Sequence, residues 1–237
     1  MKGGAADALR RAKFDVRMRC GRTPVLWHAV EAVNWRTVRR PHVRVTAATE
    51  LVMDGFPSSG NSYSIAALRF ACRAGGVPEP AVAHHLHNPG QILDGVRRSI
   101  PVLLLVREPG ATAASLVSRW PYLTVGQGLR TWVAFHERLL PAIDAMVVAD
   151  FADVTGDFGA VTRRVNARFG TAFPEFEQTE ANARAIYSPD EEGRRARRER
   201  AARAREQLAD PRHAAALERA GLLYRRLAVL AGTAPGG

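Results

Sequence analysis

The segment LVMDGFPSSGNSY, residues 51–63, is an apolar run that ends in Gly-Phe-Pro and opens into a Ser- and Asn-rich turn before a helical pattern begins. A buried strand followed by such a turn leaves the first N–H groups of the next helix unpaired, and the helix dipole adds partial positive charge there. The segment therefore predicts a strand, an anion-binding loop and a helix, with an ordinary serine-capped turn as the alternative. Hydroxyl and amide donors share this small space: Ser58, Ser59, Asn61 and Ser62.

Apolar runs suited to buried parallel strands alternate with helical patterns from this segment onward, which is typical of stacked βαβ units. This pattern predicts a three-layer α/β/α sandwich with a mainly parallel sheet and functional loops at the carboxyl ends of its strands. The expected strands are Leu51–Phe56, Ala81–Leu86, Pro101–Val106 and Ala145–Val148, with a weaker run at Val43–Thr46. The expected helices are Asn61–Ala74, Gly90–Ser99, Gly110–Arg119, Val125–Leu140 and Thr155–Phe169.

The length of 237 residues suits one such core with extensions at both ends. We expect a basic and mainly solvated arm or helix at residues 1–42, the core at 43–180, and an Arg-rich helical extension at 181–237. Residues 193–205 read GRRARRERAARAR, which predicts a solvated helix or a flexible loop. The last helix is expected to dock on the core, because apolar residues recur there at helical spacing. They are Leu217, Ala220, Tyr224 and Leu227.

The formal net charge is +11, and arginine carries nearly all of the positive charge, which favours anionic partners. Cys20 and Cys72 form no Cys-x-x-Cys pair, so the sequence gives little support for a disulfide framework or a zinc site. No run approaches the roughly 18 apolar residues of a membrane span, and the N-terminal segment lacks the apolar core of a signal peptide. We expect a cytoplasmic protein without a transmembrane segment, with a membrane-surface helix at the basic N-terminus as an alternative.

A second motif, Val106-Arg107-Glu108-Pro109, ends the third expected strand, and Ser115 follows in the next helix. Together with the first loop, this arrangement resembles the PAPS-dependent sulfotransferases, which use 3′-phosphoadenosine-5′-phosphosulfate (PAPS) as co-substrate. The run Gly55–Ser62 resembles the family's 5′-phosphosulfate loop, whose pattern is Pro, then Lys or Arg, then Ser-Gly-Thr/Asn-Thr/Ser. Arg107 and Ser115 match the spacing of the family's 3′-phosphate site. The resemblance covers about residues 51–174.

This resemblance implies a P-loop-type sheet and an enzyme that moves a sulfuryl group from PAPS to an acceptor hydroxyl, with no metal required. It further implies that Arg107 and Ser115 contact the 3′-phosphate. A helix N-terminus at one end and an arginine at the other suit the charges of such a nucleotide. Residues of the first loop would contact the 5′-phosphosulfate end: Pro57, Ser58, Ser59, Gly60, Asn61 and Ser62.

Three histidines stand in four positions, in His84-His85-Leu86-His87, at the end of the second expected strand. The resemblance implies a histidine base in a similar His-Leu-Pro context, and His85 matches that position best. If the strand continues, His87 would share a strand face with His85, whereas His84 would face the other way. A neutral imidazole is a suitable base near pH 7. A metal bound by His85 and His87 is the alternative, although no Asp, Glu or Cys stands nearby in sequence to complete the site.

Ser58 departs from the family pattern, because a Lys or Arg normally stands at this catalytic position. Loss of a cation where charge develops costs on the order of 3 kcal/mol of transition-state stabilisation unless another cation replaces it. The candidate replacements are Arg119, Arg194 and Arg195.

The acceptor is expected to be a hydroxyl-bearing carbohydrate, lipid or small metabolite. Core packing is the alternative role for some of the candidate acceptor residues, because apolar residues and two of the candidates recur at helical spacing between positions 129 and 140. The residues expected to contact the acceptor are Trp120, Tyr122, Trp132 and His136.

Two other functions stay open at this point. One is a nucleotide-binding protein of the same fold that has lost catalysis, which Ser58 favours. The other is a protein that binds polyanions through Gly193–Arg205, although this run lacks the interleaved aromatic residues that would favour nucleic acid. A Walker-type ATPase fits poorly, because the loop lacks the Gly-Lys-Ser/Thr ending.

Overall fold

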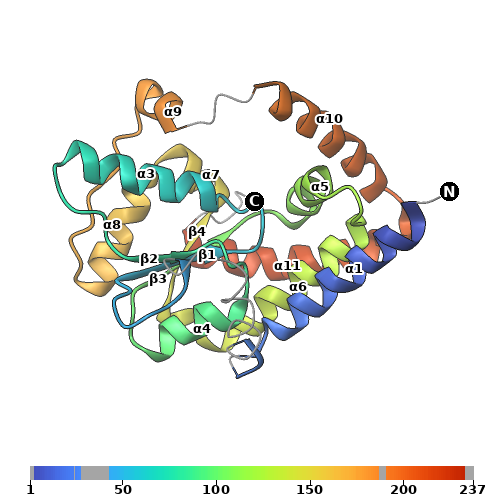
Figure 1. Ribbon diagram of the computed structural model, residues 1–237, viewed down its shortest axis with the longest axis horizontal. Coiled ribbons are helices and arrows are strands. Elements are labelled where there is room, and N and C mark those ends of the chain that lie inside the picture. Colours follow the sequence, from blue (N-terminus) through green and yellow to red (C-terminus); the bar gives the residue numbers. More distant parts are fainter. Residues whose placement is uncertain (1–2, 24, 28–42, 187–190, 233–237) are drawn as a thin grey trace.

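The computed structural model describes residues 3–23, 25–27, 43–186 and 191–232. Within these residues, the chain forms a four-stranded, all-parallel sheet with the order β2-β1-β3-β4, surrounded by helices (Figure 1). Val52 at the centre of the sheet is aligned with Ala83 on one side and with Val102 on the other. The strands are β1 (Leu51–Gly55), β2 (Val82–His84), β3 (Val102–Val106) and β4 (Val147–Asp150).

Four helices that connect the strands lie close to their predicted positions: α3 (Asn61–Ala74), α4 (Pro89–Arg97), α5 (Pro109–Arg119) and α6 (Val125–Leu139). Two helices follow β4, α7 (Phe151–Gly156) and α8 (Phe158–Phe169). The other helices are α1 (Gly3–Cys20), α9 (Glu180–Ile186), α10 (Glu191–Leu208) and α11 (Ala214–Ala231), with short 3-10 helices at Leu140–Ala145 and Pro211–His213.

Two sequence predictions of secondary structure were wrong. The single helix expected at Thr155–Phe169 is interrupted at Asp157, whose extended backbone ends α7 and whose carboxylate accepts the N–H of Ala160 at 2.9 Å and so caps α8. The weak strand expected at Val43–Thr46 is absent from the described chain, because Thr49 Oγ1 accepts the N–H of Thr46 at 2.8 Å in a local turn.

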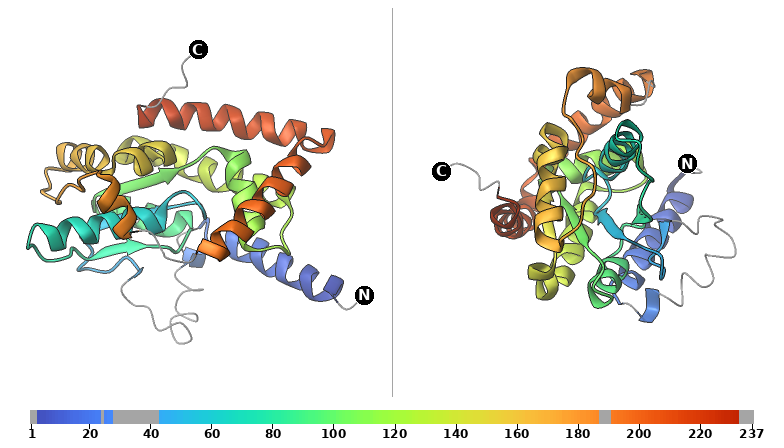
Figure 2. Two further views of the ribbon diagram at one scale, coloured as in Figure 1. Left: turned by 90° about the horizontal axis from the view of Figure 1, so that it is seen from above. Right: turned by 90° about the vertical axis from the view of Figure 1, so that its left-hand side faces the viewer.

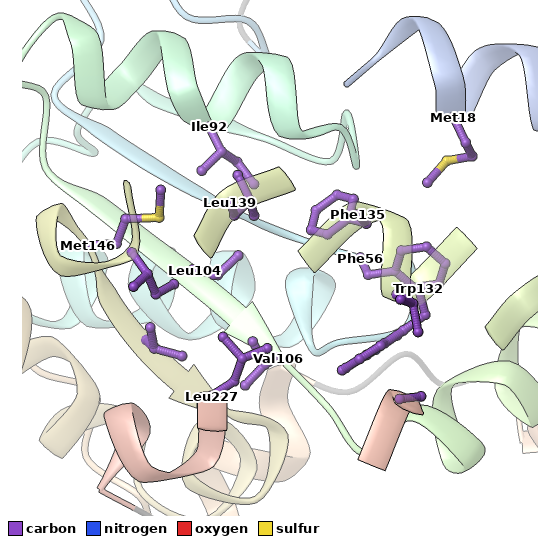
Figure 3. Close-up of a cluster of buried hydrophobic side chains, with 14 of the residues drawn as sticks. Met18, Phe56, Ile92, Leu104, Val106, Trp132, Phe135, Leu139, Met146 and Leu227 are labelled. Carbon is purple, nitrogen blue, oxygen red and sulfur yellow. The ribbon is translucent and has the colours of Figure 1, made fainter. Parts of the chain in front are cut away.

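Helices cover both faces of the sheet, because successive strand residues point to opposite sides. Leu104 packs in one core with α4, α6 and α11 (Figure 3), whereas Leu103 and Leu105 pack in a second core beneath α3, α7 and α8. The right-hand view of Figure 2 shows helices on either side of the strands. The predicted mixed α/β architecture with a parallel sheet is confirmed.

The N-terminal and C-terminal helices pack on this core. The basic N-terminal segment forms the helix α1, most of whose residues are exposed, while Phe14 and Met18 are buried in the first core. The part of the predicted basic arm at residues 28–42 lies outside the described residues. The Arg-rich run forms α10, which lies along α5 (Figure 1) and buries Ala204 there. The predicted docking of α11 is confirmed, because Leu227 is buried and Tyr224 Oη donates a hydrogen bond to Asp150 at 2.7 Å. No helix in the described part of the chain has both the length and the apolar character to cross a bilayer.

Candidate functional site

A cavity of about 200 Å³ lies where the loops after β1, β2 and β3 meet. Parallel strands place their carboxyl ends at one edge of a sheet, and this brings the three predicted motifs together although they are far apart in sequence. Pro57 and Ser59 are buried within the first loop and do not line the cavity. The predicted residues that do line it are Ser58, Gly60, Asn61, Ser62, His85, His87, Arg107 and Ser115, and they are joined by Tyr63, Arg119 and Phe151.

The first loop holds polar atoms that lack partners. Ser58 and Gly60 have left-handed backbone conformations, with φ of 75° and 97°, and α3 begins without a side-chain cap. Among the described residues, the buried atoms Ser58 Oγ, Ser59 Oγ and Asn61 Oδ1 have no hydrogen-bond partner. Buried polar atoms without partners are costly and rare in folded proteins, so they indicate a place for a ligand. The free N–H groups at the start of α3 favour an anionic one.

Arg107 connects this loop to the far side of the cavity. Its guanidinium donates to the carbonyl oxygen of Ser58 at 3.1 Å and lies 3.9 Å from the centre of the Phe151 ring. Burial, followed by the charge of Arg205, lowers the pKa of Arg107, but an arginine stays charged at neutral pH. Phe151 was missed by the sequence predictions, although its position directly after β4, at the carboxyl edge of the sheet, was a usable signal.

A second cavity of about 540 Å³ shares Arg107, Ser115 and Arg119 with the first and continues to α10. Arg119, predicted as a replacement cation, lines both cavities. Arg195 does not line them and is 74% exposed beside Glu199, so that candidate is not supported, and the side chain of Arg194 lies outside the described residues. In its place, α10 contributes Arg197, Arg198 and Arg205.

The α10 arginines were missed as individual residues, although the sequence carried a signal for them. Positions 198, 201 and 205 recur at helical spacing and lie on one face of α10, where Ala201 allows close packing on α5. The result is a strongly positive wall along one side of the cleft.

A buried carboxylate, Asp54 of β1, organises the histidine run. It accepts the N–H groups of Gly55 at 2.9 Å and of Leu86 and His87 at 3.0 Å each. These bonds turn the chain away from the sheet, so β2 ends at His84, and His85 and His87 take left-handed conformations with φ of 60° and 53°. The expected strand Ala81–Leu86 is therefore shorter than predicted, and the condition under which His85 and His87 would share a strand face is not met.

The two histidines that line the cavity have different partners. His87 Nδ1 lies 2.9 Å from the carbonyl oxygen of Gly55 and 3.3 Å from Asp54 Oδ1. His85 Nε2 lies 3.1 Å from Ser62 Oγ, and its Nδ1 contacts His84 Nδ1. Burial, followed by the charge of His87, lowers the pKa of His85 below its ordinary value.

The four residues expected to contact the acceptor do not line either cavity. Trp132 and His136 are fully buried, and His136 Nδ1 donates to the carbonyl oxygen of Trp132 at 2.8 Å. Trp120 packs near the ring of Phe14, and Tyr122 lies near the guanidinium of Arg10. Trp132 and His136 therefore match the core-packing alternative, because a helical stripe of apolar residues favours the core.

Among the described residues, no group of three or more His, Cys, Asp or Glu side chains is arranged to hold a metal ion. Comparisons with protein-family models, curated proteins and solved structures found no match to this chain. The interpretation of the site therefore rests on its residues and their geometry.

Proposed function

We propose that this protein is a PAPS-dependent sulfotransferase with a P-loop-type core, whose nucleotide lies in the cleft between the first loop, α5 and α10. The main support is a pair of buried and unpartnered polar atoms that belong to cavity-lining residues, Ser58 Oγ and Asn61 Oδ1, at the start of a helix beside Arg107. A site with several hydrogen-bonding atoms, a helix N-terminus and arginines fits a ligand with more than one phosphate group.

The roles of the residues follow from their places along the cleft. The loop from Ser59 to Ser62 binds the 5′-phosphosulfate end, and Arg107 and Ser115 bind the 3′-phosphate, as the resemblance implies. Arg119 lines both cavities and supplies a cation where Ser58 does not. The α10 arginines add positive charge along the nucleotide.

The proposed reaction is an in-line displacement at sulfur. The acceptor hydroxyl oxygen forms a bond to sulfur while the bond between sulfur and the bridging oxygen of the 5′-phosphate breaks, and the bridging electrons leave with 3′-phosphoadenosine 5′-phosphate. A histidine that lines the cavity takes the hydroxyl proton. The cleft residues hold both ends of the nucleotide, so the sulfuryl group is positioned for attack.

Isothermal titration with 3′-phosphoadenosine 5′-phosphate and with ATP tests this proposal. We expect saturable binding of the first nucleotide, much weaker binding of ATP, and a loss of affinity of about 10- to 100-fold in Arg107→Ala, because bonds to charged groups contribute about 1.5–3 kcal/mol. Arg195→Ala removes the same charge from an exposed position and should bind normally. The absence of binding at low salt, or equal binding of both nucleotides, overturns the proposal.

A nucleotide-binding protein without catalysis is the second candidate, and the missing loop cation at Ser58 favours it. It predicts the same titration results but no sulfated product with any acceptor hydroxyl. A screen of carbohydrate, lipid and phenolic acceptors with labelled PAPS separates the two.

A further inference from the structure

We propose that Asp54 and His87 form a dyad in which the buried carboxylate, together with the carbonyl oxygen of Gly55, holds the proton of His87 on Nδ1 and leaves Nε2 as the general base. This proposal deepens the proposed function and rests on it for the identity of the reaction. It assigns the proton transfer to His87, whereas the resemblance points to His85. It also gives a positioning role to Asp54, a residue for which the sequence predicted none.

Asp54 stands in an unusual place for a carboxylate. It is fully buried in β1, next to Met53 of the second core and aligned with Leu104 of the first. An ionised carboxylate in such a position costs several kcal/mol unless it is paired and hydrogen-bonded. The N–H groups of Leu86 and His87 and the amide of Gln91 converge on its Oδ2. Among the described residues, His87 is the ionisable side chain within ion-pair distance of Asp54.

These contacts keep Asp54 ionised. Burial raises the pKa of the carboxyl, but the hydrogen bond and charge of His87 and the backbone N–H groups outweigh burial, so the pKa lies below its ordinary value. A negative charge therefore persists 3.3 Å from His87 Nδ1 at neutral pH. Such a charge stabilises the imidazolium that forms when the ring takes up a proton.

The position of the proton on His87 follows from its neighbours. The carbonyl oxygen of Gly55, 2.9 Å from Nδ1, can only accept a hydrogen bond, so Nδ1 must carry the hydrogen. In the neutral ring, Nε2 then holds the lone pair. Within the described part of the chain, Nε2 has no hydrogen-bond partner, and the ring lines the cavity.

His85 differs from His87 in the contacts of its ring nitrogens. Both of its ring nitrogens contact other side chains, one at Ser62 Oγ and one at His84. Its Nε2 would have to break the contact with Ser62 before it could take a proton from an acceptor. We therefore assign His85 to holding the start of α3 against the histidine run. In the proposed step, the acceptor proton moves to His87 Nε2, and the Nδ1 proton stays where it is.

Nitrogen-15 NMR of the histidine rings tests the dyad without any nucleotide. In the wild-type protein, we expect the signals lost in His87→Gln to be those of an Nδ1–H tautomer at pH 7.5. In Asp54→Asn, the carbonyl oxygen of Gly55 still accepts from Nδ1, but the carboxylate acceptor beside it is lost, so we expect a smaller population of the Nδ1–H tautomer and a larger one of the Nε2–H tautomer. The transfer rate of this variant should fall about 100-fold or more, with nucleotide affinity within about threefold of wild type.

Two results overturn the dyad: an Nε2–H tautomer of His87 in the wild-type protein, or a His87 spectrum that Asp54→Asn leaves unchanged. The wild-type spectrum remains a test if Asp54→Asn does not fold. His136, whose Nδ1 donates to the carbonyl oxygen of Trp132, serves as an internal reference whose tautomer Asp54→Asn should not change. Because the spectra need no nucleotide, the dyad and the proposed function fail independently: a correct tautomer without nucleotide binding rejects only the function.

Discussion

His87 and His136 make the same hydrogen bond in two very different regions of the molecule. Each lies with Nδ1 against a backbone carbonyl oxygen, that of Gly55 at 2.9 Å and that of Trp132 at 2.8 Å. Each therefore leaves Nε2 with the lone pair. In the core, however, Nε2 of His136 is buried without a described partner among aromatic rings, whereas His87 has Asp54 beside it and a cavity before it.

The contrast shows which surroundings allow a histidine to accept a proton from a ligand. Burial lowers the pKa of His136 to about 4, so this ring stays neutral and has no reason to gain a proton in the folded protein at neutral pH. His87 differs in its surroundings, because the carboxylate of Asp54 lies beside its Nδ1 and its ring lines a cavity. Both residues are histidines with Nδ1 hydrogen-bonded to a backbone carbonyl oxygen. The proposed difference in their roles therefore comes from the carboxylate beside His87 and from the cavity that its ring lines.

The largest effect that would sharpen this contrast is on catalysis. We expect His87→Gln to lower the sulfuryl transfer rate by about 10²- to 10⁴-fold, because a general base contributes on that order, and His85→Gln to lower it less than about tenfold. The release of 3′-phosphoadenosine 5′-phosphate in a single turnover, with an acceptor found by screening, measures both. A greater loss in His85→Gln would return the base to His85.

A smaller effect is expected on stability in acid. Because the folded-state pKa of His136, about 4, lies below its ordinary value of 6.5, the unfolded chain binds more protons between these pH values. The His136 contribution is therefore intact above pH 6.5 and is lost as pH falls, by about 3 kcal/mol at pH 4. Urea unfolding from pH 7 to pH 4 should show this loss in wild type and a correspondingly smaller loss in His136→Leu. Equal pH dependence in both proteins would contradict it.

The smallest effect concerns the unpartnered hydroxyl of Ser58. Its Oγ is buried without a described partner, so Ser58→Ala removes no intramolecular hydrogen bond and should leave the free energy of unfolding unchanged within about 0.5 kcal/mol. The affinity for 3′-phosphoadenosine 5′-phosphate should fall about three- to tenfold, the equivalent of one hydrogen bond. Thermal unfolding and calorimetry on the same preparation measure the two changes. Lower stability with normal affinity would make the hydroxyl structural.

Much of the fold could be predicted because its signals are local. The buried strand at Leu51–Gly55 and the helix at Asn61–Ala74 follow from an apolar run, a Gly-containing turn and a helical pattern, which need no distant contact. The same local signals marked the starts of α4 and α5 at Pro89 and Pro109. The cavity loops then came together because the strands are parallel.

The predictions that failed concern features that depend on contacts between residues distant in sequence. The end of β2 at His84 is set by Asp54, which takes the N–H groups of residues 86 and 87 from 32 and 33 positions away. An apolar stripe likewise cannot tell a core face from a ligand face, so Trp132 and His136 were assigned to an acceptor. The role of Asp54 was hidden for the same reason, since its neighbours in sequence are all apolar or glycine.

Because Asp54 is buried beside His87, a substitution at one of these two positions affects the other. A lineage that replaced His87 alone would keep a carboxylate stranded in an apolar strand, and one that replaced Asp54 alone would keep a histidine whose proton is no longer directed. We therefore expect related proteins that lack the proposed reaction to differ at both positions rather than at one. In a related protein, an apolar residue in place of Asp54 would indicate that the fold is kept and the proposed reaction is lost.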